Sequence, residues 1–229
     1  MAPVLATSRS TIKRALPQPG PRRFPLDLAR GITMNVDFSL QTRAYLGLYE
    51  LELNRHLRRL CPPQSCSFDV GAQFGYDALI LAKLGRGRVV SFEADPTCFE
   101  AMTANFALNP TLGPLITPVI GFVGAGGTGA GGALSLDDYA SSTDGFVPDF
   151  VKVDVDGAEA SVLAGARGLL ADRRPHMLVE VHSEELKHQC GRLLVEHGYR
   201  PTIVNQRRVL RDYRPIAHNR WLVAAGRPR

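Results

Sequence analysis

Along the chain, short apolar runs alternate with segments in which apolar residues recur at helical spacing. This alternation predicts a sheet covered by helices. Short apolar runs that end at polar or acidic residues predict strands at 66–70, 88–93, 116–123, 149–155, 176–182, 200–205 and 220–225. Helical spacing between these runs predicts helices over 76–84, 96–108, 157–171 and 184–198. Such alternation is typical of an α/β fold, so we expect a doubly wound, mostly parallel seven-stranded sheet with helices on both faces.

An amphipathic segment precedes the first of these strands. From Thr42 to Leu60, leucine and tyrosine residues recur at helical spacing between arginine and glutamate residues, which predicts one helix. Residues 1–35 are rich in proline and arginine, so we expect a basic N-terminal arm there and one domain over residues 36–229.

Composition and charge narrow the function classes. The chain has 229 residues, of which 45% are apolar, and this is enough for one well-buried core. Its net charge of +5 is confined to residues 1–30, which hold six of the 27 basic residues and one of the 22 acidic residues. The remainder is balanced, so a basic face for nucleic acid is not expected.

The N-terminal residues lack the long apolar run of a secretory signal or a membrane span. Acidic residues are scarce before Asp27, which leaves a transit peptide open beside a mobile end or an arm packed on a partner subunit. The cysteines are Cys61, Cys66, Cys98 and Cys190. Because they show no CxxC spacing, we expect reduced thiols in a cytoplasmic protein.

Two acidic residues, Asp69 and Glu93, close the first two predicted strands, and a glycine-rich turn follows Asp69. Gly71 and Gly75 let the backbone turn tightly and approach a ligand. An acid at the end of the second strand of such a unit is placed to accept hydrogen bonds from ribose hydroxyls. The pattern therefore predicts a site for an adenosine cofactor.

The glycine spacing argues against a dinucleotide. Gly71 and Gly75 form GxxxG without a third glycine, and a pyrophosphate needs free N–H groups at a helix N-terminus. A sulfonium cofactor carries positive charge and suits Asp69 better. The plainer alternative is a crossover without ligand, in which Gly75 only permits close packing. The glycine-rich stretch 121–132 is not followed by Gly-Lys-Ser/Thr, which favours a flexible linker over a phosphate cradle.

Several blocks in order along the chain resemble the FkbM-type methyltransferases. They are Phe68–Tyr76, Phe92–Pro96, Asn105 with Asn109, Ser135–Asp138, Asp149–Glu159, Val162–Gly165 and Pro175–His182. The resemblance begins near Tyr49 and ends at Asn219–Ala224, so it covers most of the chain. One departure is Gln73, where the family usually has asparagine.

The resemblance implies a class I enzyme that uses S-adenosylmethionine, on a Rossmann-like sheet whose C-terminal strand is antiparallel. The expected cofactor-binding residues are Asp69, Gly71, Ala72, Gln73, Phe74, Gly75, Tyr76, Glu93, Ala94, Asp95, Gly121 and Asp154. Family members methylate sugars of glycolipids or polysaccharides and hydroxyls of polyketide-type natural products. These are the implied acceptor classes.

Methylation of a hydroxyl needs a general base or a metal, because an alcohol is a poor nucleophile near neutral pH. Asp154 lies at the end of one predicted strand and His182 at the end of the next, and we expect these two to form the catalytic pair at the carboxyl ends of the strands. Glu180 shares the face of His182. Since Mg²⁺ prefers oxygen ligands, the histidine argues against direct coordination, and we expect no metal.

Four residues are expected to contact the acceptor: Tyr49, Glu50, Glu180 and His218. Asp156 and Glu159 match the spacing of a capping box, which favours a structural role at a helix start. Arg207, Arg208, Arg211 and Arg214 could meet an anionic or glycosidic substrate, although such a run is more often a solvated edge.

The sequence therefore predicts an O-methyltransferase acting on a small molecule, a sugar or a lipid-linked glycan, without a transmembrane segment and with homo-oligomers left open. Three alternatives remain: an N-methyltransferase, a non-catalytic cofactor-binding scaffold and an NAD-dependent oxidoreductase. The missing third glycine disfavours the last.

Overall fold

A computed structural model describes residues 17–126, 132–142, 146–207 and 220–227, and it divides the chain into two compact units, Met1–Leu51 and Glu52–Arg229. In the first unit, β1 (Gly20–Arg23) pairs with β2 (Thr33–Val36) in antiparallel register, with Gly20 opposite Val36. The short helix α2 (Thr42–Tyr45) follows, and the Tyr45 ring meets Phe24 edge to face with centroids 5.6 Å apart.

The predicted helix over 42–60 is wrong, because the chain leaves helical geometry between α2 and the next helix. Gly47 and Glu50 have positive φ angles of 67° and 43°, and such residues end a right-handed helix. A 3-10 turn (Leu51–Leu53) then leads into α3 (Asn54–Leu60).

The second unit holds a seven-stranded sheet in the order β5-β4-β3-β6-β7-β9-β8. Its strands are β3 (Ser67–Val70), β4 (Val89–Glu93), β5 (Ile116–Ile120), β6 (Phe150–Val153), β7 (His176–Val181), β8 (Thr202–Asn205) and β9 (Arg220–Ala224). The first five in sequence are parallel, and β9 is antiparallel to both β7 and β8. The predicted sheet is thus confirmed, including its antiparallel C-terminal strand.

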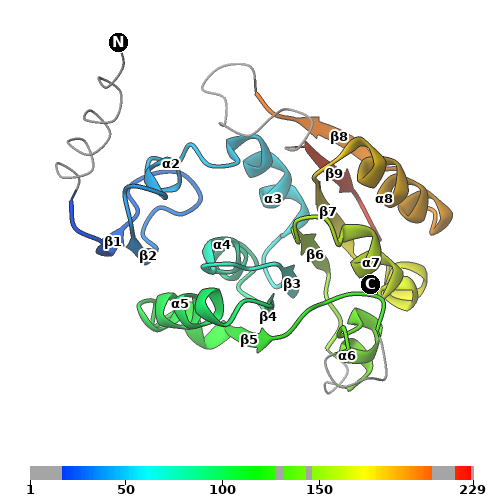
Figure 1. The fold of residues 1–229 in the computed structure, drawn as a ribbon, viewed down its shortest axis with the longest axis horizontal. Coiled ribbons are helices and arrows are strands. Elements are labelled where there is room, and N and C mark those ends of the chain that lie inside the picture. The colour runs from blue at the N-terminus through cyan, green and yellow to red at the C-terminus, as the bar shows by residue number, and fades with distance from the viewer. Residues whose placement is uncertain (1–16, 127–131, 143–145, 208–219, 228–229) are drawn as a thin grey trace, which may run out of the picture. The chain divides into compact units, whose positions relative to one another are not determined.

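Helices cover both faces of this sheet. Figure 1 shows α3, α4 (Tyr76–Gly85) and α5 (Pro96–Ala107) along one face, and α6 (Leu136–Ser142), α7 (Glu159–Ala164) and α8 (Glu184–Glu196) along the other. Local signals fix their starts: the Asp95 side chain accepts the Cys98 N–H (2.9 Å) before α5, and the Ser183 hydroxyl accepts the Leu186 N–H (3.0 Å) before α8. None of the described helices is long and apolar enough to cross a membrane.

Two predicted elements, the strand over 116–123 and the helix over 157–171, are shorter than expected, and α6 was not predicted. The third strand ends at Ile120 rather than 123, and a 3-10 turn (Gly113–Leu115) precedes it. The helix predicted over 157–171 is α7 followed by one π-helical turn (Leu169–Arg173). A side chain at Gly165 would lie 1.9 Å from the Gly124 carbonyl oxygen, so the loop after β5 packs where α7 ends.

The core lies between the strands and these helices. All four residues of β3 and of β6 are buried, as expected for parallel strands covered on both faces. Phe68 meets Phe92 edge to face at 5.4 Å, and Phe92 meets Tyr139 of α6 at 5.0 Å. The strand order reverses between β3 and β6: from β3 the chain winds outward through β4 and β5, then returns to β6 on the other side of β3. In open α/β sheets the ligand crevice lies at such a reversal.

Candidate functional site

The turn after β3 lies directly against the end of β6. Gly71 has a φ of 84°, and a Cβ there would stand 1.7 Å from the carbonyl oxygen of Asp154. The Gly71 and Ala72 N–H groups both donate to the Phe92 carbonyl (3.0 Å each). The turn is therefore held between the ends of β4 and β6, at the reversal of strand order.

Gly75 serves packing as well as turning. It precedes α4 with a φ of 79°, and a Cβ there would lie 2.5 Å from the Phe106 ring of α5. The sequence left open whether Gly75 only permits close packing. The short distance to Phe106 shows that close packing requires a glycine at this position. Between the glycines, the Phe74 carbonyl accepts a hydrogen bond from the Asn105 side chain (2.9 Å), which ties the turn to α5.

The Glu93 carboxylate stands beside this turn. Its Oε2 accepts the Gln73 N–H (2.7 Å) and its Oε1 accepts the Asp95 N–H (2.8 Å). The Gly121 N–H donates to the Glu93 carbonyl (2.9 Å), so the loop after β5 begins next to the same strand end. The predicted residues 69, 71–76, 93–95 and 121 thus gather at the carboxyl edge of β3, β4 and β5.

Asp69 is buried within β3, and its oxygens have no hydrogen-bond partner among the described residues. Burial raises the pKa of Asp69 to about 7, against the opposing charge of Lys152. Lys152 lies opposite Asp69 in the β3–β6 register and is itself 2% exposed. Its ammonium forms ion pairs with Asp77 Oδ2 (3.0 Å) and Asp154 Oδ2 (3.3 Å). Lys152 and Asp77 were not predicted as site residues, although a lysine in an otherwise apolar strand was a visible signal.

His182 follows β7 and faces the end of β6. Its Nε2 lies 3.6 Å from Asp154 Oδ1 and 3.2 Å from Asp156 Oδ1. Its Nδ1 lies 2.6 Å from Oε1 of the fully buried Glu159. Burial lowers the pKa of His182, but the hydrogen bond to Glu159 and the charge of Asp154 outweigh it and hold this pKa above its ordinary value.

Two carboxyl groups beside His182, those of Asp154 and Glu159, have pKa values below the ordinary value. Burial opposes the charge of Asp154, yet Lys152 and His182 lower its pKa below the ordinary value. Burial likewise opposes the charge of Glu159, and hydrogen bonds from His182 and the Gly157 N–H lower its pKa. The predicted pair, Asp154 and His182, therefore lies together in one carboxylate-rich site.

The capping box predicted for Asp156 and Glu159 is wrong. The residue that caps α7 is Ala158, and no side chain caps that helix. Asp156 has a φ of 47° and Gly157 a φ of 113°, so the chain turns before α7 begins. This turn aims Glu159 inward at His182, a contact across 23 residues that spacing within one helix could not reveal.

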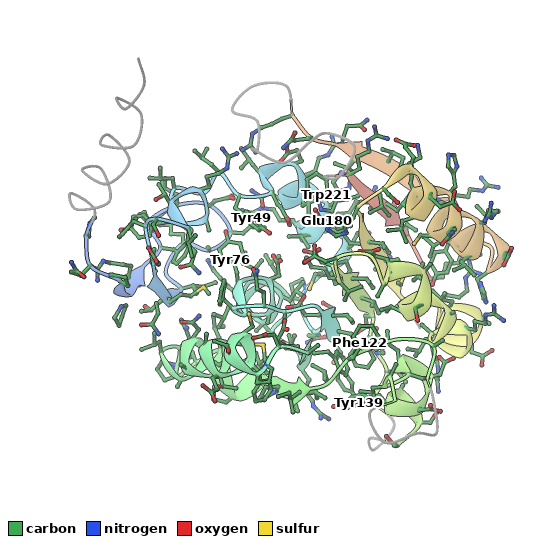
Figure 2. All side chains as sticks on the ribbon, in the orientation of Figure 1. Tyr49, Tyr76, Phe122, Tyr139, Glu180 and Trp221 are labelled. Atoms are coloured by element: carbon green, nitrogen blue, oxygen red, sulfur yellow. The ribbon has the colours of Figure 1, made fainter. Side chains whose placement is uncertain are left out.

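Of the four residues predicted to contact the acceptor, Glu180 is the one that the structure describes in the second unit. Glu180 is fully buried in β7 and accepts the indole N–H of Trp221 on β9 (3.2 Å). Figure 2 labels these two side chains. Tyr49 and Glu50 belong to the first unit, and His218 lies outside the described residues. Of the arginine cluster, Arg207 pairs with Glu52 (3.1 Å), whereas Arg208, Arg211 and Arg214 also lie outside the described residues.

In comparisons with known proteins, this chain matches one family model and several solved structures. A family model described as methyltransferase FkbM domain matches residues 132–201. A search of curated proteins by sequence finds no match.

Three solved structures are similar over most of this chain. Methyltransferase FkbM from Methylobacillus flagellatus KT is 17% identical, with a TM-score of 0.53 over 83% of this chain and 56% of that chain. A SAM-dependent O-methyltransferase from Thermotoga maritima is 12% identical, with a TM-score of 0.57 over 86% and 73%. TYW2 from P. horikoshii, in complex with MeSAdo, is 16% identical, with a TM-score of 0.55 over 85% and 67%. At these identities the likeness shows the fold.

Proposed function

We propose, from the premise that this chain is a methyltransferase with an FkbM domain over residues 132–201, that it transfers a methyl group from S-adenosylmethionine to a hydroxyl. The acceptor classes are a sugar or glycan and a polyketide-type natural product, on the resemblance stated above. The observation that carries the proposal is the meeting of the Glu93 carboxylate, the Gly71 turn and the Asp154–His182 pair at the reversal of strand order.

The residues of this edge suit a cationic adenosine ligand. S-adenosylmethionine supplies its methyl group from a positively charged sulfonium. The buried Asp69 oxygens have no partner among the described residues, and the neighbouring carboxylates make the edge negative. We assign ribose recognition to Glu93, and the remaining contacts to Asp69, Gly71, Ala72, Gln73, Phe74, Gly75, Tyr76, Ala94, Asp95, Gly121 and Asp154.

Asp154 and His182 deal with the acceptor proton in this proposal. Glu159 accepts at Nδ1 of His182 (2.6 Å), which fixes the tautomer and leaves Nε2 facing Asp154. A base whose conjugate acid is stabilised by neighbouring carboxylates can take up the hydroxyl proton near neutral pH. Holding the hydroxyl close to the methyl group supplies much of the remaining catalysis.

Calorimetric titration tests the cofactor site. We expect wild-type protein to bind S-adenosylmethionine and S-adenosylhomocysteine but not NAD, and Glu93→Ala to lose both sulfur cofactors. Glu100→Ala, which removes an exposed carboxyl from α5, is the matched control and should bind as wild type does. No binding by wild-type protein would contradict the proposal, and binding of NAD alone would favour the oxidoreductase.

A second measurement separates hydroxyl from amine acceptors. A neutral amine is already nucleophilic and needs less help from a base. Turnover of a hydroxyl acceptor should fall at least about 100-fold in His182→Gln with cofactor affinity retained. His188→Gln, on α8, controls for the loss of a histidine. Turnover that survives the loss of both Asp154 and His182 would favour N-methylation.

Substrate contacts by Tyr49, Glu50, Glu180 and His218 stay predictions, as does a cytoplasmic location. The cysteines Cys61, Cys66, Cys98 and Cys190 form no disulfide in the structure.

A further inference from the structure

Lys152 is a buried cation within β6, on the face of the sheet opposite the main apolar core. Its neighbours Val151 and Val153 belong to that core, so the alternation of the strand turns Lys152 the other way, toward α4. The side chain is 2% exposed. A buried ion pair is weak evidence for stability, because well-packed apolar residues of similar volume often stabilise a core as well. Packing alone therefore does not account for this lysine.

The Lys152 ammonium joins two parts of the candidate site. Its Nζ lies 3.0 Å from Oδ2 of Asp77, which stands in the first turn of α4, directly after the glycine-rich turn. The same Nζ lies 3.3 Å from Oδ2 of Asp154 at the end of β6. One cation thus links the helix that follows the glycine-rich turn with the carboxylate that faces His182.

The ion pair with Lys152 orients the Asp154 carboxyl. The ammonium holds Oδ2, and Oδ1 lies 3.6 Å from Nε2 of His182. Glu180 also hydrogen-bonds to this carboxyl. Burial opposes the charge of Asp154, and Lys152 makes the largest of the contributions that hold its pKa below the ordinary value. The ammonium therefore fixes the orientation of this carboxylate and favours its charged form.

A third carboxyl group stands beside the same ammonium. Asp69 lies opposite Lys152 in the β3–β6 register, so the two side chains share one face of the sheet. Burial raises the pKa of Asp69 to about 7, and the charge of Lys152 makes the largest opposing contribution. Carboxyl groups from β3, α4 and β6 thus meet at one ammonium. Removing its charge would favour the protonated forms of Asp69 and Asp154.

We propose that Lys152 is a positioning residue for the methyl transfer: it holds the Asp154 carboxylate turned toward His182 and links it to the start of α4. The inference rests on the proposed function, in which Asp154 contacts the cofactor and pairs with His182. Lys152 acts through Asp154 and Asp77, and it exchanges no proton with the acceptor. Such support from a locked neighbouring side chain is what a preorganised site requires.

Carboxyl ¹³C NMR of full-length protein labelled at aspartate tests the pairing without any cofactor. The Asp154 signal, identified by its loss in Asp154→Asn, should titrate below the ordinary range in wild-type protein and at higher pH in Lys152→Met, because the ammonium no longer opposes burial. Lys152→Arg keeps the charge and should bring the pKa of Asp154 back down. Lys187→Met, which removes an ammonium from α8, is the matched control and should leave this titration unchanged.

The pH dependence of S-adenosylmethionine binding separates positioning from a merely structural role. Protonation of Asp69 and Asp154 removes negative charge from the site, so the affinity for this cation should begin to fall at higher pH in Lys152→Met than in wild type. At pH 7 we expect the variant to bind at least about 10-fold more weakly, the effect of one pKa unit, and the deficit should shrink by about pH 8.5. A structural defect would give the same deficit at both pH values.

An Asp154 pKa that is the same in wild type and Lys152→Met overturns the inference, as does a binding deficit that does not change with pH. If circular dichroism shows that Lys152→Met does not fold, Asp77→Asn replaces it: this variant keeps the shape of the side chain and breaks the link to α4. It should weaken S-adenosylmethionine binding, and unchanged binding overturns the link. Wild-type protein in which Lys152 holds the pKa of Asp154 low, but which binds no S-adenosylmethionine, contradicts the proposed function and not the pairing.

Discussion

Single residues at the end of β3 set the geometry of the candidate site. Gly71 owes its importance to a missing side chain, because the end of β6 occupies the space that a Cβ would need. Asp69 owes its importance to burial, because desolvation disfavours its ionised form. The glycine was conspicuous in the sequence, but its contact partner was not.

Gly71→Ala should lower the free energy of unfolding by about 3 kcal/mol or more, since strain at a positive φ adds to a clash with backbone. Urea unfolding measures this. Gly191→Ala is the matched control: it lies within α8 with open space around the added Cβ, so we expect stabilisation of about 1 kcal/mol. Equal stabilities for the two variants would contradict the close approach of the turn to β6.

The pKa of Asp69 predicts a pH-dependent effect of Asp69→Asn. The folded pKa of about 7 lies above the ordinary value, so the contribution of Asp69 to stability is complete below about pH 4 and is lost as pH rises to about 7. Asparagine has no such loss. Relative to wild type, the variant should therefore gain about 1–3 kcal/mol between pH 5 and pH 8.

The comparison uses urea unfolding with chelator present, so that no cation binds the neighbouring carboxylates. Asp172→Asn, which removes an exposed carboxyl, is the control. A constant difference between Asp69→Asn and wild type across this range would show that Asp69 is already ionised at pH 5.

At the scale of elements, α6 and the π-helical turn are linked by one side chain. Asp137 at the start of α6 accepts the N–H groups of Gly168 (2.8 Å) and Leu169 (2.8 Å). It thereby satisfies the backbone where α7 has ended and the π-helical turn begins. The Ser135–Asp138 block, which the sequence showed only as part of the resemblance, has a structural role here.

Asp137→Ala should cost about 2–3 kcal/mol of unfolding free energy, because two backbone donors lose a charged acceptor. Asp138→Ala is the control, since Asp138 is the exposed neighbour on the same helix. Chemical denaturation measures the free energy of unfolding of both variants. A loss of less than about 0.5 kcal/mol in Asp137→Ala would mean that water replaces the carboxylate at this join.

At the scale of the whole molecule, the order of strands assembles the site. The ends of β3 and β6 meet because the chain winds to one side of β3 and then to the other. The residues that we assign to the cofactor and the acceptor come from the ends of β3 to β7 and thus share one edge, and ligand binding there should stabilise the native state as a whole.

S-adenosylhomocysteine at about 100 times its Kd should add about 2.7 kcal/mol to the free energy of unfolding, because it binds only the folded chain. Thermal unfolding followed by circular dichroism should show a Tm rise of roughly 5–10 °C. Glu93→Ala should show no rise, and NAD should give none with wild-type protein. A rise with NAD of the same size would point to a different cofactor.

The amino-acid sequence determined the elements of the sheet and the position of the glycine-rich turn after β3. Runs such as Ser67–Val70 and Phe150–Val153 are apolar because both faces of a parallel strand are buried, so their signal is local and readable. The resemblance to FkbM-type methyltransferases, which the family model bears out, also came from local blocks.

The tertiary structure alone decided which of these residues meet. The break at Gly47 and Glu50, the pairing of Lys152 with Asp77 and the contact of Glu159 with His182 all depend on where distant segments lie. Such contacts follow from strand order and close packing, which local periodicity does not encode. Asp154, Glu180 and His182 stand apart in the sequence, and only the fold brings one side-chain atom of each within 4.8 Å of the others.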